Sequence, residues 1–143
     1  MKYSLIIDKN KEEEVIVIAH EKHELVEKIE KLFFNNDKEL TGYLDDEIII
    51  LDISKIACFI SEDNNVYALV GEYRYKVKKR LYQIEEILDD DFIKINQSCI
   101  ANINQISRFK ASFNGFLEVI FKNGYKDYVS RRELKNVKGR MGI

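Results

Sequence analysis

Proline and tryptophan are absent from this sequence of 143 residues, and only two cysteines occur. Cys58 and Cys99 both stand among apolar neighbours, and neither lies in a C-x-x-C arrangement. Two such cysteines do not predict a disulfide framework or a metal site. We interpret them as buried free thiols in a reducing compartment, which predicts a cytoplasmic protein.

Long hydrophobic runs are also missing. No stretch approaches the roughly 18 apolar residues that span a membrane, and the apolar run near the N-terminus is too short for a signal peptide. We therefore expect no membrane insertion. The chain is 45% hydrophobic and contains eight Phe and eight Tyr, which suffices for the core of one domain with a small extension.

Enzyme signatures are absent as well. The sequence contains no P-loop, dinucleotide-binding or nucleophile-elbow glycine motif. Its two histidines, His20 and His23, lie among charged residues with no further metal ligand at a suitable spacing, so we interpret them as surface residues. The acids at positions 89–91 are consecutive and cannot all face one ion on a regular element. We expect no catalytic site, metal or cofactor, and predict that the protein is not an enzyme.

Charge is present but unevenly distributed. The formal net charge is −2, yet residues 92–143 carry ten Lys or Arg against three acids, whereas residues 1–44 carry seven against ten. Screening confines surface charge effects to roughly 8–10 Å, so the local field matters more than the total. The basic C-terminal part predicts an anionic partner.

The first 43 residues are typical of a β-β-α unit. Residues 3–8 and 15–19 are predicted strands, and from residue 21 apolar side chains recur at helical spacing up to Asn35 and Asn36. Such a unit is too small for a core of its own. It must pack on the rest of the chain or on a second copy.

Residues 44–143 predict a strand-rich domain, giving an α+β, predominantly β, fold class. Two Asn-Gly pairs, at 114–115 and 123–124, predict type I′ hairpins, and Ser130 with Glu133 predicts a capping box that opens a last helix. The predicted strands are 47–52, 56–61, 66–70, 72–77, 92–95, 106–112, 116–122 and 125–129, with a helix at 78–88 and a loop at 96–104.

Cations stand where the two predicted C-terminal helices begin. Positive charge opposes the macrodipole there, at a cost of about 0.3–1 kcal/mol each, while the free N–H groups of a helix start favour phosphate. This placement indicates a polyanionic ligand rather than local stability. The residues are Lys78, Lys79 and Arg80 for one helix and Arg131 and Arg132 for the other.

Loops between strands carry side chains that can read bases. Arginine pairs with guanine, and Asn or Gln pairs with adenine, in the major groove. Apart from Arg131 and Arg132, the candidates are Asn64 and Asn65 in one loop and Asn96, Gln97 and Ser98 in another. Each Asn or Gln taken alone is also an ordinary turn residue.

The combined spacing of these segments resembles the LytTR DNA-binding domain over about residues 44–143. This resemblance implies a β-rich domain of bacterial transcription regulators that places loops, rather than a recognition helix, into successive major grooves. The matching residues are 66–69, Leu81, Ile84, Leu88, 92–95, 98–103, Ile106, 117–119, 123–124 and 129–132.

The resemblance also implies roles for individual residues. Gln97 falls at a polar base-contacting position before the motif serine, Ser98, and Arg131 and Arg132 fall on the arginine segment after the last strand. Asn64 and Asn65 occupy the first contacting loop, and Lys78, Lys79 and Arg80 match a helix start that contacts the DNA backbone. Asn102 matches a motif asparagine that we expect to brace the loop. Gln97 stands where other polar residues are equally common, so its base preference is not inherited.

Many response regulators with this domain carry a receiver of about 120 residues in front of it, and the segment 1–43 is too short for one. It resembles the extension of stand-alone LytTR regulators. We therefore predict a cytoplasmic transcriptional regulator that binds double-stranded DNA. We expect it to be a homodimer, with residues 1–43 as the dimerisation unit. The sequence does not identify a regulatory protein partner. The alternative is a protein-interaction module that uses its basic face to bind an acidic protein.

Overall fold

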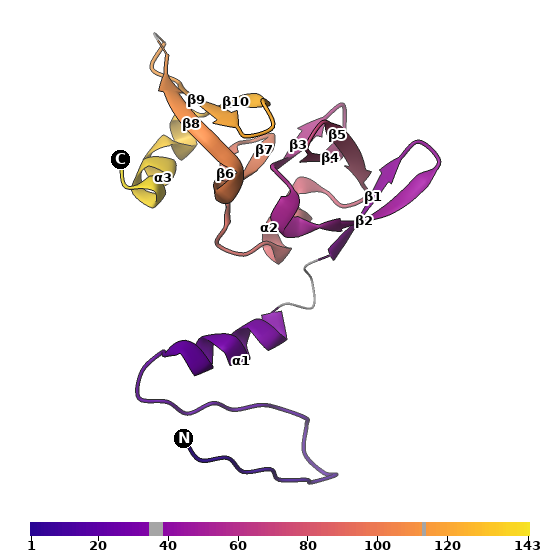
Figure 1. The fold of residues 1–143 in the computed structure, drawn as a ribbon, viewed down its shortest axis with the longest axis vertical. Coiled ribbons are helices and arrows are strands. Elements are labelled where there is room, and N and C mark those ends of the chain that lie inside the picture. Colours follow the sequence, from indigo (N-terminus) through magenta and orange to yellow (C-terminus); the bar gives the residue numbers. More distant parts are fainter. Residues whose placement is uncertain (35–38, 113) are drawn as a thin grey trace. The chain divides into compact units, whose positions relative to one another are not determined.

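The computed structural model describes residues 1–34, 39–112 and 114–143 (Figure 1). The chain separates into two compact units, Met1–Asn36 and Asp37–Ile143. Both β-sheets lie in the second unit, which is the unit that carries the predicted contact residues. No helix in the described part of the chain has the length and apolar content needed to cross a bilayer.

Among the described residues of the N-terminal unit, 1–34, one regular element is present, helix α1 (Glu24–Phe34). The helix was predicted, and its predicted end at Asn35 and Asn36 lies outside the described residues. The two strands predicted at residues 3–8 and 15–19 are wrong, because neither segment pairs with a neighbour. A strand requires its N–H and C=O groups to be bonded to another strand. Apolar side chains of both segments are exposed instead, Ile7 by 85% and Ile18 by 89%.

Seven antiparallel strands form the larger sheet, in the order β2-β1-β5-β4-β3-β7-β6 (Figure 1). Five of them match predicted strands within two residues, whereas β1 and β7 were not predicted. The strands are β1 (Glu39–Leu44), β2 (Glu47–Asp52), β3 (Cys58–Glu62), β4 (Asn65–Val70), β5 (Tyr73–Val77), β6 (Phe92–Asn96) and β7 (Cys99–Asn102). Single 3-10 turns follow two of them, η2 (Ile53–Lys55) and η3 (Ile103–Gln105).

Strand β7 corrects the prediction that residues 96–104 form a loop. All four of its residues are buried, and it lies between β3 and β6 in the sheet. A central strand covered on both faces shows a continuous apolar run instead of alternation, and four residues are too few for that run to stand out.

Strand β1 groups with the second unit, although the prediction placed residues up to 43 in the N-terminal extension. It pairs with β2 from Glu39 opposite Asp52 to Leu44 opposite Glu47. Gly42 makes this packing possible. A Cβ at that position would lie 2.7 Å from Leu51 Cδ1 and 2.9 Å from Tyr75 Cβ.

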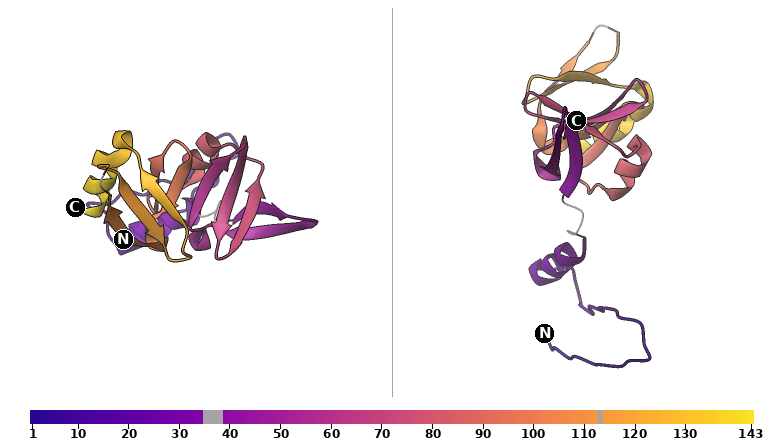
Figure 2. Two further views of the ribbon diagram at one scale, coloured as in Figure 1. Left: turned by 90° about the horizontal axis from the view of Figure 1, so that it is seen from above. Right: turned by 90° about the vertical axis from the view of Figure 1, so that its right-hand side faces the viewer.

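The predicted C-terminal meander forms the smaller sheet, in the order β10-β9-β8, which lies beside the larger sheet (Figure 2). Its strands are β8 (Ile106–Ala111), β9 (Leu117–Phe121) and β10 (Lys126–Val129), and the remaining helices are α2 (Leu81–Ile87) and α3 (Arg131–Met141).

The turn at Asn123 and Gly124 is a hairpin, but it is not type I′. Only Gly124 has a positive φ, of 90°, and its N–H donates to Phe121 O at 2.9 Å. At the other Asn-Gly pair, Gly115 has a φ of 76°, and residue 113 lies outside the described part. The hairpin with two left-handed residues joins β3 to β4 through Asp63 and Asn64, with φ of 52° and 65°.

Central strands of the larger sheet are buried on both faces because successive side chains point to opposite sides. Phe59, Ala68 and Ile100 pack in the cluster that contains Ile84 of α2, whereas Cys58, Ile60, Leu69 and Cys99 pack in the cluster that contains Phe121 of β9 and Val137 of α3. The prediction of buried free cysteines is confirmed. The adjacent Cys58 thiol, and then burial, raise the pKa of the Cys99 thiol.

Candidate nucleic-acid interface

The predicted contact loops meet at one end of the larger sheet, which we term the loop end. Antiparallel pairing explains why they meet. β4 begins where β3 ends, with Glu62 opposite Asn65, and β5 ends beside the start of β4, with Val66 opposite Val77. β7 begins near the same place, with Ile60 opposite Cys99. The turns after β3 and β6 and the segment after β5 therefore project from the same end.

A groove of about 630 Å³ runs along part of the loop end. It brings the predicted loop residues Asn64 and Asn65 together with the predicted backbone-contacting cations Lys78, Lys79 and Arg80. Lys76 adds a fourth cation, and none of the lining residues that the structure describes is acidic. We term it the basic groove, and its lining is Ser61, Asn64, Asn65, Val66, Lys76, Val77, Lys78, Lys79, Arg80, Leu81 and Tyr82.

Helix α2 begins later than predicted. Lys78 and Lys79 precede it, and Arg80 is its N-cap, with an extended φ of −78° and ψ of 157°. The chain leaves β5 only at Val77, so it needs these residues to turn away from the sheet before a helix can start. The N–H of Arg80 donates to Oε1 of Gln83 at 2.9 Å. The cations therefore flank the helix start rather than form its first turn.

Lys78 has an aromatic partner that the sequence did not reveal. Its Nζ lies 4.6 Å from the centroid of the Tyr43 ring on β1. A cation over a ring face is attracted by about 0.5–1 kcal/mol at an exposed site. Tyr43 thus orients one cation of the basic groove, and pairing across the sheet is what brings the two residues together.

The turn between β6 and β7 exposes Gln97 and Ser98, as expected for a contact loop. The N–H of Ser98 donates to Oδ1 of Asn96 at 2.8 Å, and the carbonyl of Ser98 accepts the N–H of Ser61 at 2.8 Å. Ser61 also lines the basic groove. The second bond therefore connects the Gln97–Ser98 turn to β3, the strand that leads into the first contact loop.

The start of α3 exposes Arg131 and Arg132, at the place the sequence predicted. Ser130 is the N-cap, but the predicted capping box is wrong because its side chain makes no cap hydrogen bond. Its backbone N–H instead donates to the carbonyl of Ile95 at 2.9 Å. This bond holds the helix start against β6, next to the Gln97–Ser98 turn.

Asn102 does not belong to this surface. It is 1% exposed, and its Nδ2 donates to the carbonyls of Ile56 at 2.9 Å and Ser54 at 3.2 Å, while Oδ1 accepts the N–H of Asn104 at 3.0 Å. It lies at the end of β7 remote from Gln97. The side chain braces the chain around β3 and β7, and it offers no atom to a ligand.

Asn96 also departs from its predicted place. The sequence groups it with Gln97 and Ser98 as a candidate base-reading loop residue, but it ends β6 and is 4% exposed. Its amide bonds to β10 instead of projecting from the surface. The sequence showed only a polar residue directly after an apolar strand segment. That pattern fits an exposed turn residue as well as a buried strand end.

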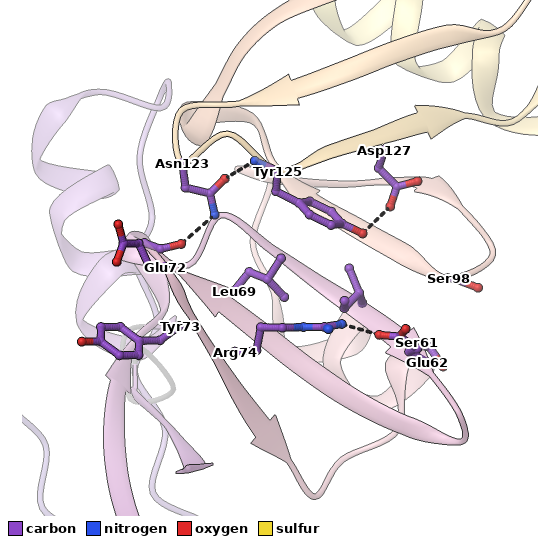
Figure 3. A pocket seen from close by; sticks show the side chains of 12 residues that line it. Ser61, Glu62, Leu69, Glu72, Tyr73, Arg74, Ser98, Asn123, Tyr125 and Asp127 are labelled. Atoms are coloured by element: carbon purple, nitrogen blue, oxygen red, sulfur yellow. Dashed lines mark hydrogen bonds and ion pairs between the residues drawn. The ribbon is translucent and has the colours of Figure 1, made fainter. Parts of the chain in front are cut away.

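A cavity of about 470 Å³ lies between the two sheets, with Ser98 in its wall (Figure 3). On the side of the smaller sheet, the Tyr125 hydroxyl donates to Oδ2 of Asp127 at 3.2 Å, and between the sheets Nδ2 of Asn123 donates to the carbonyl of Gly71 at 3.1 Å. Burial, and then the negative charge of Asp127, raise the pKa of the Tyr125 hydroxyl well above its ordinary value. The Asn123–Gly71 bond links the smaller sheet to the turn between β4 and β5, at the end of β4 opposite the loop end.

The geometry is that of a binding protein whose ligand is anionic and extended. Exposed cations and amide side chains line one end of a rigid sheet. Within the described residues, Lys78, Lys79, Arg80, Arg131 and Arg132 form no ion pair. This combination suits the phosphates and base edges of a nucleic acid.

The sequence pattern of the LytTr DNA-binding domain family matches residues 46–142. The chain therefore belongs to the LytTR family, and its class is a DNA-binding protein rather than an enzyme. Its fold is similar to that of the LytTr DNA-binding domain of a Bacillus cereus protein, with a TM-score of 0.71 and 23% sequence identity. That likeness covers 76% of this chain and 100% of the other.

Relatives in Staphylococcus aureus match the whole chain. Proteins of strain COL and of a bovine strain are 35% and 36% identical over 146 residues, covering 100% of this chain and 99% of each relative. Both are named as uncharacterised HTH-type transcriptional regulators. In the described part of this chain, strands separate each helix from the next, so no two helices form a helix-turn-helix.

Proposed function

We propose that this protein is a cytoplasmic transcriptional regulator that binds duplex DNA sequence-specifically through the loop end of its larger sheet. The observation that carries the proposal is the meeting of three predicted contact elements at that end. A backbone bond from Ser61 to Ser98 joins the Gln97–Ser98 turn to β3, which leads into the Asn64–Asn65 loop. A second bond, from Ser130 to Ile95, joins the start of α3 to β6, which leads into the turn.

Each element supplies a different part of recognition. Cations beside the basic groove are suited to phosphates, which fix the register of a protein on DNA. Gln97, Asn64 and Arg132 are exposed side chains with the donors that read base edges in the major groove. Because they stand on turns and a helix start rather than along one helix, we propose that loops enter the groove.

Selection of bound duplexes from a random DNA pool tests sequence specificity directly. We expect an enriched sequence, and a slope of log K against log salt of about −5 if roughly five or six cations contact phosphates. A pool that shows no enrichment, together with a flat salt dependence, contradicts the proposal. That result would favour the alternative, in which the basic face binds an acidic protein.

We also propose that the N-terminal unit joins two copies into a homodimer. Its segments 3–8 and 15–19 expose large apolar residues, among them Ile6, Ile7, Ile16 and Ile18. The unit is too small to bury them by itself. A second copy with the same exposed side chains supplies the apolar cover.

Sedimentation of the full chain tests this assembly. We expect a dimer, and we expect Ile18→Asp to shift it to a monomer because the substitution places a charge in the apolar cover. Ile48→Asp is the matched control, since Ile48 is an exposed isoleucine of β2 in the other unit. A monomeric parent chain, or equal effects of the two substitutions, contradicts the assignment of the dimer contact to the N-terminal unit.

A further inference from the structure

Asn96 is a buried polar residue whose side chain touches both sides of the candidate interface. Its Oδ1 accepts the N–H of Ser98 at 2.8 Å, which shapes the Gln97–Ser98 turn. Its Nδ2 donates to the carbonyl of Tyr128 at 2.8 Å and to Oδ1 of Asp127 at 2.9 Å. One side chain thereby connects the end of β6 to the end of β10.

An irregularity in β6 turns this side chain inward. Lys94 pairs with Ile100 and Asn96 pairs with Cys99, so the register shifts by one residue between them. Ile95 and Asn96 are consequently both buried, although successive strand residues normally point to opposite faces. A bulge that redirects a side chain is a frequent feature beside functional sites.

The carboxylate of Asp127 holds the other end of the connection. Its Oδ1 accepts both the amide of Asn96 and the N–H of Tyr128, the latter at 2.8 Å. Its Oδ2 accepts the hydroxyl of Tyr125 at 3.2 Å, and both residues line the cavity in Figure 3. The two oxygens thus have separate partners, so the two links can be tested separately.

Bonds on either side extend the connection to the candidate contact residues. Gln97 follows Asn96 directly in the chain, and Arg131 lies three residues after Tyr128. Ser130 adds a backbone bond to Ile95, the other bulged residue, at 2.9 Å. The two bulged residues therefore bond to both contact elements: Asn96 to the Gln97–Ser98 turn, and Ile95 to Ser130 at the start of α3.

We propose that Asn96 and Asp127 are positioning residues that hold the Gln97–Ser98 turn and the Arg131–Arg132 helix start in a fixed mutual arrangement for DNA. The inference rests on the proposed function, because it assigns no DNA contact to either residue. A site held in place before binding loses less conformational freedom on association. Supporting side chains of this kind determine whether contact residues reach their partners together.

The experiment measures the affinity of full-length variants for a duplex selected from a random pool and for a random-sequence duplex of equal length. We expect Asn96→Ala to weaken binding to the selected duplex about tenfold, within the range for coupled neighbours. Binding to the random duplex should stay unchanged. Gln97→Ala should then cost less in the Asn96→Ala background than in the parent chain.

Two variants at Asp127 keep the test decisive if Asn96→Ala fails to fold. Asp127→Ala removes the acceptor of the Asn96 amide and should reproduce the loss. Asp127→Asn retains an oxygen that can accept the hydrogen bond from the Asn96 amide, so this variant should keep the preference for the selected duplex. Tyr125→Phe is the matched control, because it removes only the bond to Oδ2 and should leave both affinities unchanged.

The outcomes separate this inference from the proposed function. If Gln97→Ala lowers affinity for the selected duplex while Asn96→Ala and Asp127→Ala do not, the positioning role is overturned and the proposed function stands. If these two variants weaken both duplexes equally and in step with lost thermal stability, their role is structural only, which also overturns the inference. If no duplex is enriched at all, the proposed function itself is overturned.

Discussion

The guanidinium carbon of Arg131 lies 5.7 Å from the centroid of the Phe116 ring, and that ring meets the ring of Tyr128 edge-on at 5.9 Å. Phe116 follows the turn after β8, where its carbonyl accepts both the N–H and the hydroxyl of Ser112. The smaller sheet therefore presents an aromatic support to the first residue of α3.

Replacing Phe116 by leucine should weaken DNA binding through Arg131. The substitution keeps an apolar side chain but removes the ring face, and a contact worth about 0.5–1 kcal/mol at an exposed site corresponds to a two- to fivefold loss. Phe116→Tyr preserves the ring and should have little effect. The measurement is a double-mutant cycle with Arg131→Ala, in which additive losses rule out a coupling between the two side chains.

Base readers and phosphate contacts should separate by their dependence on sequence. Gln97→Ala and Arg132→Ala should each cost about 1–3 kcal/mol on the selected duplex and much less on random DNA. Lys79→Ala, beside the basic groove, should weaken all sequences alike and reduce the salt slope by about one. Titrations of the three variants at several salt concentrations make the comparison. Equal losses on both duplexes assign Gln97 or Arg132 to phosphate instead.

Local patterns predicted most of the fold because most helices, strands and turns have a recognisable sequence pattern within a few residues. Runs of β-branched and aromatic residues located β2, β4 and β5, and turn residues located the meander of β8 to β10. Strand β7 was not predicted, because four residues that are all buried show no alternation of polar and apolar side chains. Residues 3–8 and 15–19 have strand composition without a strand partner, and pairing is a property of the tertiary structure that composition does not contain.

The candidate site was predictable where residue type and exposure sufficed. Gln97, Arg131 and Lys79 are exposed on the segments where the sequence placed them. The supports of these residues were not predictable, because they come from other strands. Tyr43 reaches Lys78 across the sheet, and Asn96 turns inward only because β6 carries a bulge. Neither the Tyr43–Lys78 contact nor the inward position of Asn96 can be predicted from local sequence.

Gly42→Ala should destabilise the sheet at β1. Its Cβ would approach Leu51 Cδ1 to 2.7 Å and Tyr75 Cβ to 2.9 Å, so side chains or backbone must shift at a cost of about 1–3 kcal/mol. Gly139→Ala is the matched control in α3, where nothing lies within 4 Å and alanine favours the helix by up to about 1 kcal/mol. Thermal or urea unfolding measures both. Equal stability of Gly42→Ala and the parent chain contradicts the close approach of β1 to β5.

Asn102→Ala should lower stability without changing which DNA sequence is preferred. The substitution leaves the carbonyls of Ser54 and Ile56 and the N–H of Asn104 without their partner, and an unsatisfied buried group costs about 1–3 kcal/mol. Asn102→Asp should cost more, because a carboxylate cannot donate to either carbonyl and would be buried uncompensated. Urea unfolding gives the stability, and the ratio of affinities for selected and random duplexes gives the specificity. A lowered ratio in a folded Asn102→Ala protein would assign this residue to recognition, against its burial at the end of β7 remote from Gln97.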